Sequence, residues 1–596
     1  MFQTYRRIFT LLSRRDQRNF VVLIGLLLVS GAAEVAGIAV VIPLIAVITD
    51  PSVVEQNPLL SWGYRAGGFE TVRGFLGALC LAVFLVVVAS VTVRAATSYA
   101  IARFIRTVVL NLSLALFTTY LRHPYEWFLQ RHSADLAKTL LSETKEVVDG
   151  SVGPAMRLIA EAITCGAIIV FLLRLEPLGA LVATVVVGSA FALLYRQLRR
   201  MLERIGEARR IANGERFQIS QEALGGIKDV KMLSLEETYI RRFYDPSARQ
   251  ARYQAVAQIA GELPRYALEA LAFGGMLIVL FVLLSTSSQG LSYVLPVFGA
   301  FALAGLRLLP TIQIMFRSAT QMRFVAPALD ALMGELAKRA PPAPPPTGDP
   351  VALRREIALE GLRYSYPGAA APSLRDVTLT IPARTSCGFV GPTGAGKTTV
   401  IDLLLGLLTP QEGRIVVDGV PIEDGNRRAW QRAIGYVQQS VHLVDDTIAS
   451  NIAFGVARDR IDRAAVERAA RQAALHDFIA TLPDGYETRI GERGTRLSGG
   501  QRQRIGIARA LYRDPDVLVL DEATSALDTV TERAVMEEVG LLGGTKTVIV
   551  ITHRLSTVAR CDQIVVMRDG RIEATGSYEA LSDTEGTFTE LLRVAG

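Results

Sequence analysis

The sequence predicts an α-helical membrane domain with six transmembrane helices and long cytoplasmic extensions, followed by a soluble α/β domain with a phosphate-binding loop. Six apolar stretches lie within the first 316 residues. A proline-rich segment separates them from short β-rich runs that alternate with helical patterns. The chain has 596 residues, of which 50% are hydrophobic and 20% are charged. This length exceeds one hydrophobic core, and this composition suits a protein that is part membrane and part soluble.

Each apolar stretch is long enough for a helix to cross the hydrocarbon core of a bilayer. The stretches occupy residues 20–48, 73–101, 153–174, 177–197, 264–286 and 291–316. Only a few residues separate the third stretch from the fourth and the fifth from the sixth. We therefore expect tight turns on the outer side of the membrane at these two places.

The distribution of arginine predicts the orientation of the spans. The two long connections, residues 102–152 and 198–263, are hydrophilic and basic, and so is the N-terminus. The positive-inside rule places all three in the cytoplasm, and an even number of spans returns the C-terminus there. Long helical patterns run through both connections, so we expect the helices to extend beyond the bilayer. This topology also explains the net charge of +7, and we expect no nucleic-acid partner.

Changes in composition predict four consecutive parts. Residues 1–19 are basic and mildly amphipathic and lack the apolar core of a signal peptide, which favours an interfacial elbow helix. Residues 20–338 hold the six-span membrane domain, residues 339–350 form a proline-rich linker, and residues 351–596 form the α/β domain. The four cysteines have no metal-ligand spacing and imply no disulfide framework.

A glycine-rich loop in the α/β domain carries the clearest chemistry. The run GPTGAGKTT follows the strand-like CGFV, precedes the helix-like VIDLLLGLL and fits the pattern GxxxxGK[ST]. Its glycines let backbone N–H groups converge on phosphates, and the following helix adds its positive N-terminal end. We expect Lys397 to reach the β- and γ-phosphates of ATP and the Thr398 hydroxyl to ligate Mg²⁺. The predicted ATP-binding residues of this loop are Gly391, Pro392, Thr393, Gly394, Ala395, Gly396, Lys397, Thr398 and Thr399.

A second feature of the α/β domain is the run VLVLDE, an apolar strand pattern that ends in two carboxylates. Asp521 stands at the predicted strand tip, where it can hold Mg²⁺ through water. Glu522 follows and is the natural candidate to polarise the attacking water. An apolar strand ending in Asp-Glu is weak evidence alone, and it gains meaning from the glycine-rich loop.

Further motifs around these residues resemble those of the ABC transporter family. LSGGQ at residues 497–501 is similar to the signature motif, Gln439 in YVQQSVHL to the Q-loop glutamine, and His553 in ITHRLS to the switch histidine. The resemblance implies catalytic roles for Gln439 and His553 beside Glu522, and it places Gln439 with Thr398 and Asp521 around the metal. Beyond the loop, the implied nucleotide-binding residues are Tyr366, which would stack on adenine, Ser498, Gly499, Gly500, Gln501 and the D-loop residue Asp528.

The resemblance also implies how the chain assembles. ABC domains act in head-to-tail pairs, in which Ser498 and Gly500 of one subunit would close on ATP held by the other. One ATPase domain and six spans make half a transporter, and the intact motifs favour a homodimer over pairing with a subunit whose site is degenerate. The layout resembles that of ABC exporters. Their inner loops carry short coupling helices, for which the candidates here lie near Tyr125–His132 and Ile211–Gln221.

Ionisable residues within the spans call for an explanation, because each costs roughly 2.5–3.5 kcal/mol on insertion scales. Glu34 lies in the first span, Arg94 in the second, Arg265 and Glu269 in the fifth, and Arg307 in the sixth. Arginine suits bidentate recognition of phosphate, so one interpretation is a site for an anionic lipid head group. The other is a set of internal ion pairs that stabilise the helix bundle. The charges alone fit both.

The spans themselves resemble those of PglK-type flippases, which move lipid-linked oligosaccharides across the bacterial inner membrane. The similar stretches are SGAAEVAGIAVVIPLI, LPRYALEALAFGG and LAGLRLLPTI. Arg265 and Arg307 occupy matching positions and Arg94 matches less securely, so the resemblance implies that these arginines contact the pyrophosphate of a lipid carrier. It also implies a bacterial inner-membrane location, a lipid-linked glycan as substrate, and a short external helix between Asp50 and Arg73.

Other functions compete with flipping of a polyprenyl-pyrophosphate-linked oligosaccharide. Export of another lipid or of hydrophobic drugs would make transport indifferent to Arg265 and Arg307. DNA-handling ABC ATPases share the nucleotide motifs but lack six hydrophobic spans, so this class of function is disfavoured. A peptide exporter with an N-terminal processing protease is disfavoured, because no such domain precedes the first span of this sequence.

Overall fold

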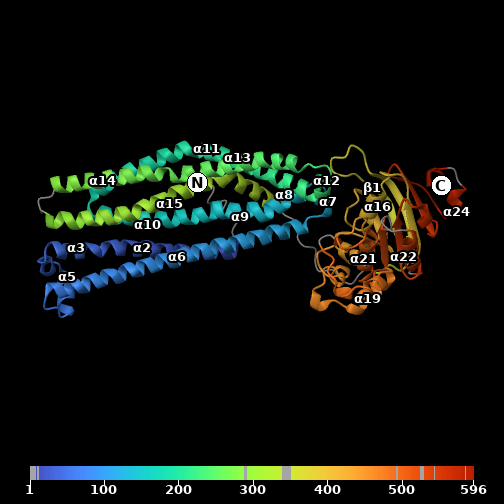
Figure 1. The fold of residues 1–596 in the computed structure, drawn as a ribbon, viewed down its shortest axis with the longest axis horizontal. Coiled ribbons are helices and arrows are strands. Elements are labelled where there is room, and N and C mark those ends of the chain that lie inside the picture. Colours follow the sequence, from blue (N-terminus) through green and yellow to red (C-terminus); the bar gives the residue numbers. More distant parts are fainter. Residues whose placement is uncertain are drawn as a thin grey trace. The chain divides into compact units, whose positions relative to one another are not determined.

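The computed structural model describes residues 9, 13–286, 291–337, 351–491, 494–523, 529–541, 544–583 and 586–595. The chain divides into two compact units (Figure 1). The first comprises Met1–His123 and Gln130–Ala340, and the second comprises Pro124–Leu129 and Pro341–Gly596. The proposed linker at 339–350 lies outside the described residues, and so does most of the proposed elbow helix at 1–19 before Ser13.

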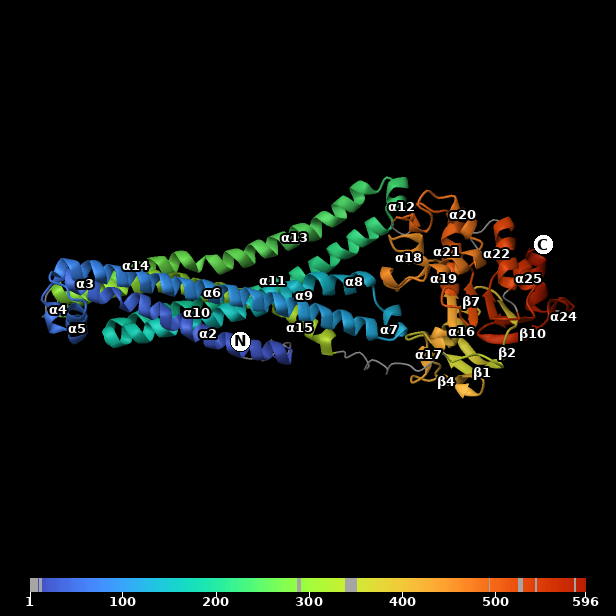
Figure 2. The same cartoon turned by 90° about the horizontal axis from the view of Figure 1, so that it is seen from below.

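The described part of the first unit is helical. Its elements are α2 Arg14–Ala39, α3 Val41–Thr49, α4 Val53–Gln56, α5 Pro58–Ala66, α6 Val72–Arg122, α8 Ser133–Lys138, α9 Thr144–Val147, α10 Gly153–Leu175, α11 Pro177–Gly225, α12 Ile227–Met232, α13 Glu236–Glu262, α14 Pro264–Thr286 and α15 Leu291–Ala337. Two π-helical turns, Thr139–Glu143 and Val148–Val152, flank α9. Figure 2 shows the long helices α2, α6, α10, α14 and α15 running roughly alongside one another.

All six predicted spans form helices. Among the described residues, five helical segments are long and apolar enough to cross a membrane. They are Arg14–Thr49, Val72–Arg122, Asp135–Leu175, Pro177–Gly225 and Val294–Ala337. The remaining predicted span, 264–286, coincides with the 23-residue helix α14. The six-helix membrane domain predicted from hydropathy is therefore confirmed.

Three helices are much longer than a bilayer requires. α6 has 51 residues, α11 has 49 and α15 has 47. At a rise of 1.5 Å per residue each is roughly 70–75 Å long, whereas the hydrocarbon core is about 30 Å thick. The prediction that the helices extend beyond the bilayer is confirmed.

The loop between α3 and α6 contains the short helix α5, within the range 50–73 for which a short external helix was predicted. Pro58 starts it, and the Asn57 side chain caps it by accepting from the backbone N–H groups of the next turn. Leu60 and Tyr64 pack against a small apolar cluster around Phe75, whereas Leu59 and Trp62 are 81% and 73% exposed. The helix is amphipathic, with one apolar face packed and the other open.

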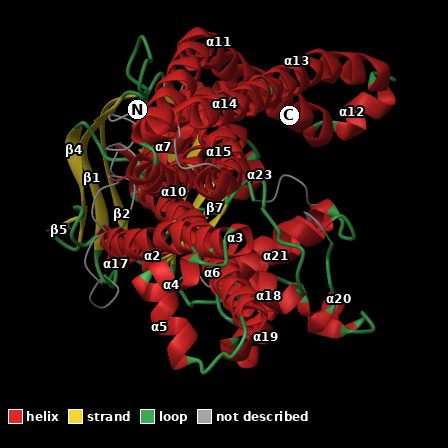
Figure 3. Cartoon of the chain, turned by 90° about the vertical axis from the view of Figure 1, so that its left-hand side faces the viewer, coloured by secondary structure: helices red, strands yellow, loops and turns green. Residues whose placement is uncertain are grey.

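The second unit contains two sheets (Figure 3). The antiparallel sheet has the order β2-β1-β4-β5, with β1 Glu356–Tyr364, β2 Leu374–Pro382, β4 Glu412–Val417 and β5 Val420–Pro421. The other has the order β10-β9-β3-β8-β7-β6, with β3 Ser386–Val390, β6 Ile434–Val437, β7 Val517–Asp521, β8 Thr547–Ile551, β9 Gln563–Arg568 and β10 Arg571–Gly576. Apart from the β9–β10 pair, the strands of this second sheet are parallel.

The second unit also contains helices. They are α7 Tyr125–Leu129, α16 Lys397–Leu404, α17 Arg427–Arg432, α18 Ile448–Ile452, α19 Arg463–Gln472, α20 His476–Ala480, α21 Gly499–Leu511, α22 Thr529–Leu541, α23 Leu555–Val558, α24 Tyr578–Ser582 and α25 Thr587–Ala595. All five residues of β7 and of β8 are buried, as a covered parallel sheet requires. The predicted α/β class of this unit is confirmed.

Parallel pairing brings the functional motifs to one edge of this sheet. The glycine-rich loop follows β3, Asp521 ends β7, and His553 lies two residues beyond β8. Gln439 lies two residues beyond β6. Because β3, β8, β7 and β6 are consecutive in the sheet, these residues meet at the carboxyl ends of neighbouring strands.

A short helix lies within the first coupling-helix candidate range, and the second candidate was wrong. α7 occupies Tyr125–Leu129, within the first candidate range, and it belongs to the second unit. Ile211–Gln221 instead lies inside the continuous helix α11. The break comes later, at Gly225 and Gly226, and the short helix that follows is α12, Ile227–Met232. Paired glycines end a helix far more readily than the single Gly214 within the predicted range.

Candidate functional site

The loop between β3 and α16 has a backbone that only glycine adopts easily. Gly394 and Gly396 have φ values of +84° and +99°, in the left-handed region. A Cβ atom on Gly396 would lie 2.9 Å from the Ser373 carbonyl oxygen and 2.8 Å from the Leu374 side chain. The loop thus wraps closely against its neighbours and leads directly into the N-terminus of α16, a favourable site for phosphate.

Lys397, the first residue of α16, turns its side chain back into this loop. Its Nζ donates to the carbonyl oxygens of Gly391 at 2.8 Å and Pro392 at 3.0 Å. Burial lowers the pKa of Lys397, and the neighbouring Glu522 and Asp521 oppose that shift. The ammonium group is therefore held inside the loop, where phosphate oxygens would replace the two carbonyl oxygens.

The two carboxylates at the end of β7 occupy different environments. Asp521 is buried and accepts a hydrogen bond of 3.2 Å from the Tyr436 hydroxyl, and burial raises its pKa. Glu522 has a φ of +46°, a left-handed conformation that is unfavourable for a side chain of this size. Its backbone N–H donates to the Ile551 carbonyl oxygen at 2.9 Å, which fixes this turn beside β8.

The Glu522 carboxylate is held from two sides. Gln439 Nε2 donates to its Oε2 at 2.5 Å, and His553 Nε2 lies 3.0 Å from its Oε1. The structure thus brings together the three residues that the sequence predicted as catalytic. A carboxylate fixed by a donor on each oxygen is positioned to orient a water molecule rather than to move freely.

The residues predicted to hold Mg²⁺ offer oxygen ligands, which is the donor set that this cation prefers. Thr398 is exposed at the start of α16, and Asp521 provides a carboxylate. Because Gln439 uses its nitrogen to bind Glu522, its carbonyl oxygen remains for the cation. One carboxylate with neutral oxygens suits Mg²⁺, which takes the rest of its shell from nucleotide phosphates and water. The residues fit the group.

The signature residues start helix α21. Ser498 is the N-cap: its hydroxyl accepts from Gln501 N at 3.2 Å, and its backbone N–H donates to Gln501 Oε1 at 2.8 Å. Gly499 and Gly500 form the first turn, and Ser498 is exposed. Within this single chain the N-terminus of α21 is therefore open at its surface. Asp528 lies outside the described residues.

In the first unit, a buried carboxylate lies close to two arginine side chains. Glu34 of α2 is 4% exposed; its Oε1 lies 3.3 Å from Arg94 Nη1 of α6, and its Oε2 lies 3.6 Å from Arg307 Nε of α15. Arg265 instead donates to Glu269, one turn along α14, at 2.8 Å. The structure brings Glu34, Arg94 and Arg307 together and pairs Arg265 separately.

Glu161 of α10 is a further member of this group that the sequence analysis missed. Its carboxylate hydrogen-bonds with the side chain of Thr311 and lies within electrostatic range of Arg94 and Glu34. The signal was present, because Glu161 is an ionisable residue inside the predicted span 153–174. With Glu161 included, two carboxyl groups and two guanidinium groups lie near one another. Glu34, Arg94, Glu161 and Arg307 are called the charge cluster below.

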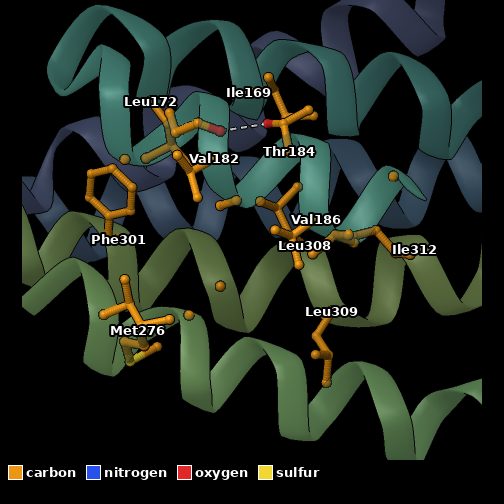
Figure 4. Close-up of a pocket in the computed structure, with 18 of the residues that line it drawn as sticks. Ile169, Leu172, Val182, Thr184, Val186, Met276, Phe301, Leu308, Leu309 and Ile312 are labelled. Carbon is orange, nitrogen blue, oxygen red and sulfur yellow. Dashed lines mark hydrogen bonds between the residues drawn. The ribbon is translucent and has the colours of Figure 1, made fainter. Parts of the chain in front are cut away.

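An apolar cavity of about 750 Å³ lies between α10, α11, α14 and α15 (Figure 4). Its wall includes Leu172, Val186, Met276, Phe301 and Leu308. Leu308 follows Arg307 of the charge cluster directly in the chain. The cavity is wide enough for hydrocarbon and offers almost no polar partner, which favours an apolar chain over a polar solute.

Comparison with known proteins decides the family. The family model described as "ABC transporter" matches residues 374–525, and that described as "ABC transporter transmembrane region" matches residues 20–304. A protein of Cupriavidus metallidurans named "ATP-dependent lipid A-core flippase" is 31% identical over 593 residues, covering 99% of this chain and 96% of its own length. This chain belongs to the ABC transporter family.

Two more comparisons describe this ABC transporter. A protein of Ralstonia nicotianae, also named "ATP-dependent lipid A-core flippase", is 33% identical over 497 residues, or 82% of each chain. A solved bacterial Atm1-family ABC exporter with ATP bound superposes with a TM-score of 0.79 at 25% identity, covering 97% of this chain and 98% of that one. The predicted type I exporter fold is confirmed.

The chain is thus a half-transporter: one multi-pass membrane domain and one ATPase domain, the composition of an ATP-driven translocase. Its ATPase domain implies ATP binding. The sequence motifs included Gln439, Glu522 and His553, which the structure brings together. They missed Tyr436, the hydrogen-bond donor to Asp521, whose only signal was its place on β6, three residues before Gln439.

Proposed function

We propose that this ABC transporter is a homodimeric lipid flippase that uses ATP to move a phosphate-bearing glycolipid from the cytoplasmic to the outer leaflet of a bacterial inner membrane. The observation that carries the proposal is the charge cluster beside an apolar cavity in the membrane unit. Arg94 and Arg307 both approach Glu34, and Leu308 lines the cavity next to Arg307. Paired guanidinium groups suit phosphate, and the cavity suits hydrocarbon.

The nucleotide site supports hydrolysis by positioning and electrostatics. Lys397 balances charge on the phosphates, and Glu522 accepts the proton of the water that attacks the γ-phosphorus as the bond to the leaving ADP breaks. Gln439 and His553 fix Glu522 in place. Thr398, Gln439 and Asp521 would hold Mg²⁺, which neutralises charge on the phosphate oxygens when bound.

The distribution of these residues within one chain supports the proposed homodimer. Lys397 and Glu522 lie at one part of the ATPase unit, and Ser498 caps the exposed N-terminus of α21. A second copy in head-to-tail arrangement would place its Ser498, Gly499 and Gly500 over the nucleotide, adding backbone donors to the phosphates. Two copies would make two complete sites, and both termini of each copy would be cytoplasmic.

Two glycolipid classes share the required chemistry. A polyprenyl-pyrophosphate-linked oligosaccharide is the substrate class suggested by the spans that resemble PglK-type flippases. Lipid A-core is the substrate in the names of the Cupriavidus and Ralstonia relatives. Both combine phosphate groups, sugars and long apolar chains. In the alternative, export of hydrophobic drugs or of a lipid without phosphate gives no role to the arginines of the charge cluster.

The experiment is a flipping assay in proteoliposomes with each of these two glycolipids, followed by removal of the cluster charges. The variant Glu34→Gln/Arg94→Gln/Arg307→Gln removes three of the four ionisable groups of the cluster, so that no arginine remains beside Glu34 and only Glu161 is kept. We expect flipping to fall at least about tenfold while basal ATPase activity persists. Arg265→Gln is measured in parallel and tests the predicted substrate contact of that arginine, which pairs with Glu269 on its own helix.

Three outcomes separate the possibilities. Loss of flipping of one glycolipid in the triple variant identifies the substrate class. Unchanged flipping in that variant would return the cluster to a purely structural role. Failure to flip either glycolipid, together with ATPase stimulation by varied amphiphilic drugs, would overturn the lipid proposal.

A further inference from the structure

A buried carboxyl group of the ATPase unit lies outside the motifs. It belongs to Glu532 of α22, and this residue is 8% exposed. Burial of an ionised carboxylate is costly unless hydrogen bonds and an opposite charge compensate for the lost water. The hydrolysis step proposed above gives Glu532 no role. Its hydrogen-bond partners therefore indicate what it does.

The two oxygens of Glu532 bind two residues that follow His553 closely in the chain. Oε2 accepts a hydrogen bond from Arg554 Nη1, and Oε1 accepts one of 3.0 Å from the hydroxyl of Thr557. Arg554 is the next residue after His553, and Thr557 belongs to the short helix α23, which begins at Leu555. One carboxylate from a different helix thus holds both ends of this short segment.

Hydrogen bonds within the segment complete a compact turn. The backbone N–H of Arg554 donates to Thr552 Oγ1 at 3.0 Å, and the backbone N–H of Thr557 donates to the Arg554 carbonyl oxygen at 3.1 Å. Thr552 follows β8 directly and is 4% exposed. Residues 552–557 are called the histidine turn below. The turn is bonded before His553 by Thr552 and after it by Glu532.

The side chain of His553 is not fixed by burial. It is 46% exposed, and its Nε2 lies 3.0 Å from Glu522 Oε1. A side chain with so much open surface takes its position mainly from the backbone that carries it. A displacement of about 1 Å in a reacting group can cost about 100-fold in rate. The bonds that hold the histidine turn therefore bear on hydrolysis as well as on folding.

We propose that Glu532 is a positioning residue for ATP hydrolysis, which fixes the histidine turn so that the His553 ring stays against Glu522. The charge-assisted bond to Arg554 holds the residue next to His553, and the bond to Thr557 holds the helix that follows. Glu532 touches no reacting atom and acts through His553. This role deepens the proposed hydrolysis step and rests on the role given there to Glu522.

A purely structural carboxylate would make the same two bonds, and the two roles differ in what depends on His553. A structural residue contributes equally whether or not the imidazole is present. A positioning residue matters only while there is a ring to position. The double-mutant cycle between Glu532 and His553 therefore separates the two roles.

The test measures hydrolysis of radiolabelled ATP by the full-length protein in lipid nanodiscs, with protein in excess so that very slow rates remain measurable. Glu532→Ala removes both bonds, and we expect the rate to fall at least about tenfold while ATP affinity changes less than about twofold. Glu532→Gln should lose less than about threefold, because its oxygen can accept from Arg554 while its amide group donates to the Thr557 hydroxyl. Thr557→Val removes only one bond and should lower the rate about threefold.

The deciding measurement is made in the His553→Ala protein. Adding Glu532→Ala to it should lower the remaining rate by less than about twofold, because no ring is left to position. Glu573→Ala is the matched control. Glu573 of β10 likewise accepts from a threonine, through the backbone N–H and the hydroxyl of Thr587, and this contact involves no residue of the histidine turn. The control should hydrolyse ATP at the normal rate.

Three results would overturn the positioning role. They are an unchanged rate in Glu532→Ala, an equal further loss in the His553→Ala protein, and a loss of rate matched by a loss of ATP affinity. Glu522→Gln is measured alongside. Normal hydrolysis in Glu522→Gln would refute the proposed general base itself, whereas normal hydrolysis in Glu532→Ala beside an inactive Glu522→Gln would refute the positioning role alone. No glycolipid is present, so the result is independent of the proposed flipping activity.

Discussion

The carboxylate of Glu34 on α2 lies 3.6 Å from the guanidinium group of Arg307 on α15, and Glu34 is the more deeply buried partner. The side chain of Glu34 is 5% exposed, whereas those of Arg307 and Arg94 are 36% and 44% exposed. This asymmetry decides what each substitution does. Removing the carboxylate leaves two partly exposed cations, but removing the cations leaves one buried anion.

We therefore predict that Arg94→Gln/Arg307→Gln lowers the free energy of unfolding by about 3 kcal/mol, the usual result when a buried charge loses its partner. Glu34→Gln should cost less than about 1 kcal/mol, and adding it to the double variant should restore most of the loss. The test is thermal unfolding in detergent of the unaltered protein, the arginine double variant, Glu34→Gln and the triple variant. Equal losses in Glu34→Gln and in the arginine double variant would contradict this account.

A second prediction concerns Glu522, which Gln439 and His553 hold from both sides. Glu522→Gln should leave ATP affinity nearly unchanged while lowering the rate of hydrolysis at least about 100-fold, because the amide cannot accept the proton of the attacking water. Nucleotide binding and phosphate release, measured on the same sample, separate the two effects. Normal turnover in this variant would remove Glu522 from the role of general base.

The buried carboxyl group of Asp402 gives a third prediction, on pH. Burial, and then the nearby Asp521 charge, raise the pKa of Asp402 to about 6. The folded protein binds this proton more tightly than the unfolded chain does, so this contribution to stability is present at low pH and is lost as the pH rises through 6. Asp402→Asn should thus stabilise the protein more at pH 7.5 than at pH 5.0, by about 1 kcal/mol. An equal change in melting temperature at both values would show that Asp402 does not titrate in this range.

The fourth prediction compares two glycines of the phosphate-binding loop. Both have positive φ, but a Cβ on Gly396 would meet the Ser373 carbonyl oxygen at 2.9 Å, whereas a Cβ on Gly394 would meet nothing within 4 Å. Gly396→Ala should therefore weaken ATP binding at least about tenfold more than Gly394→Ala, since it adds a clash to the backbone strain. Equilibrium binding of a fluorescent nucleotide analogue checks both. Similar losses would mean that backbone strain alone governs this loop.

Much of the candidate nucleotide site could be predicted from the sequence, because the residues of that site come at or directly after the ends of strands. The residues after β3, β6, β7 and β8 must meet at one edge of a parallel sheet, so motif order was enough to bring Gln439, Glu522 and His553 together. Asp402 and Tyr436 were missed, since burial beneath a loop depends on packing that no local pattern records.

The membrane unit was predictable in its helices and less so in its contacts. A span that is apolar on every side carries no periodicity to show which face meets a neighbour. Rotation about the helix axis decides that Arg307 faces Glu34 while Arg265 pairs along its own helix. Glu161, by contrast, was predictable, because it is an ionisable residue inside the predicted span 153–174. The position of the second coupling helix was wrong because the hydrophilic pattern of α11 continues without a break to Gly225.

The 51 residues of α6 contain no proline, whereas α15 contains Pro296, Pro310 and Pro327. A proline interrupts the hydrogen bonding of a helix and lets it bend, so α6 resists bending where α15 yields. A stiff rod roughly 75 Å long that tilts by about 5° about one end carries the other end through about 6–7 Å. A small rotation imposed near Arg122 would thus become a displacement about as wide as an acyl chain at Val72, the other end of α6.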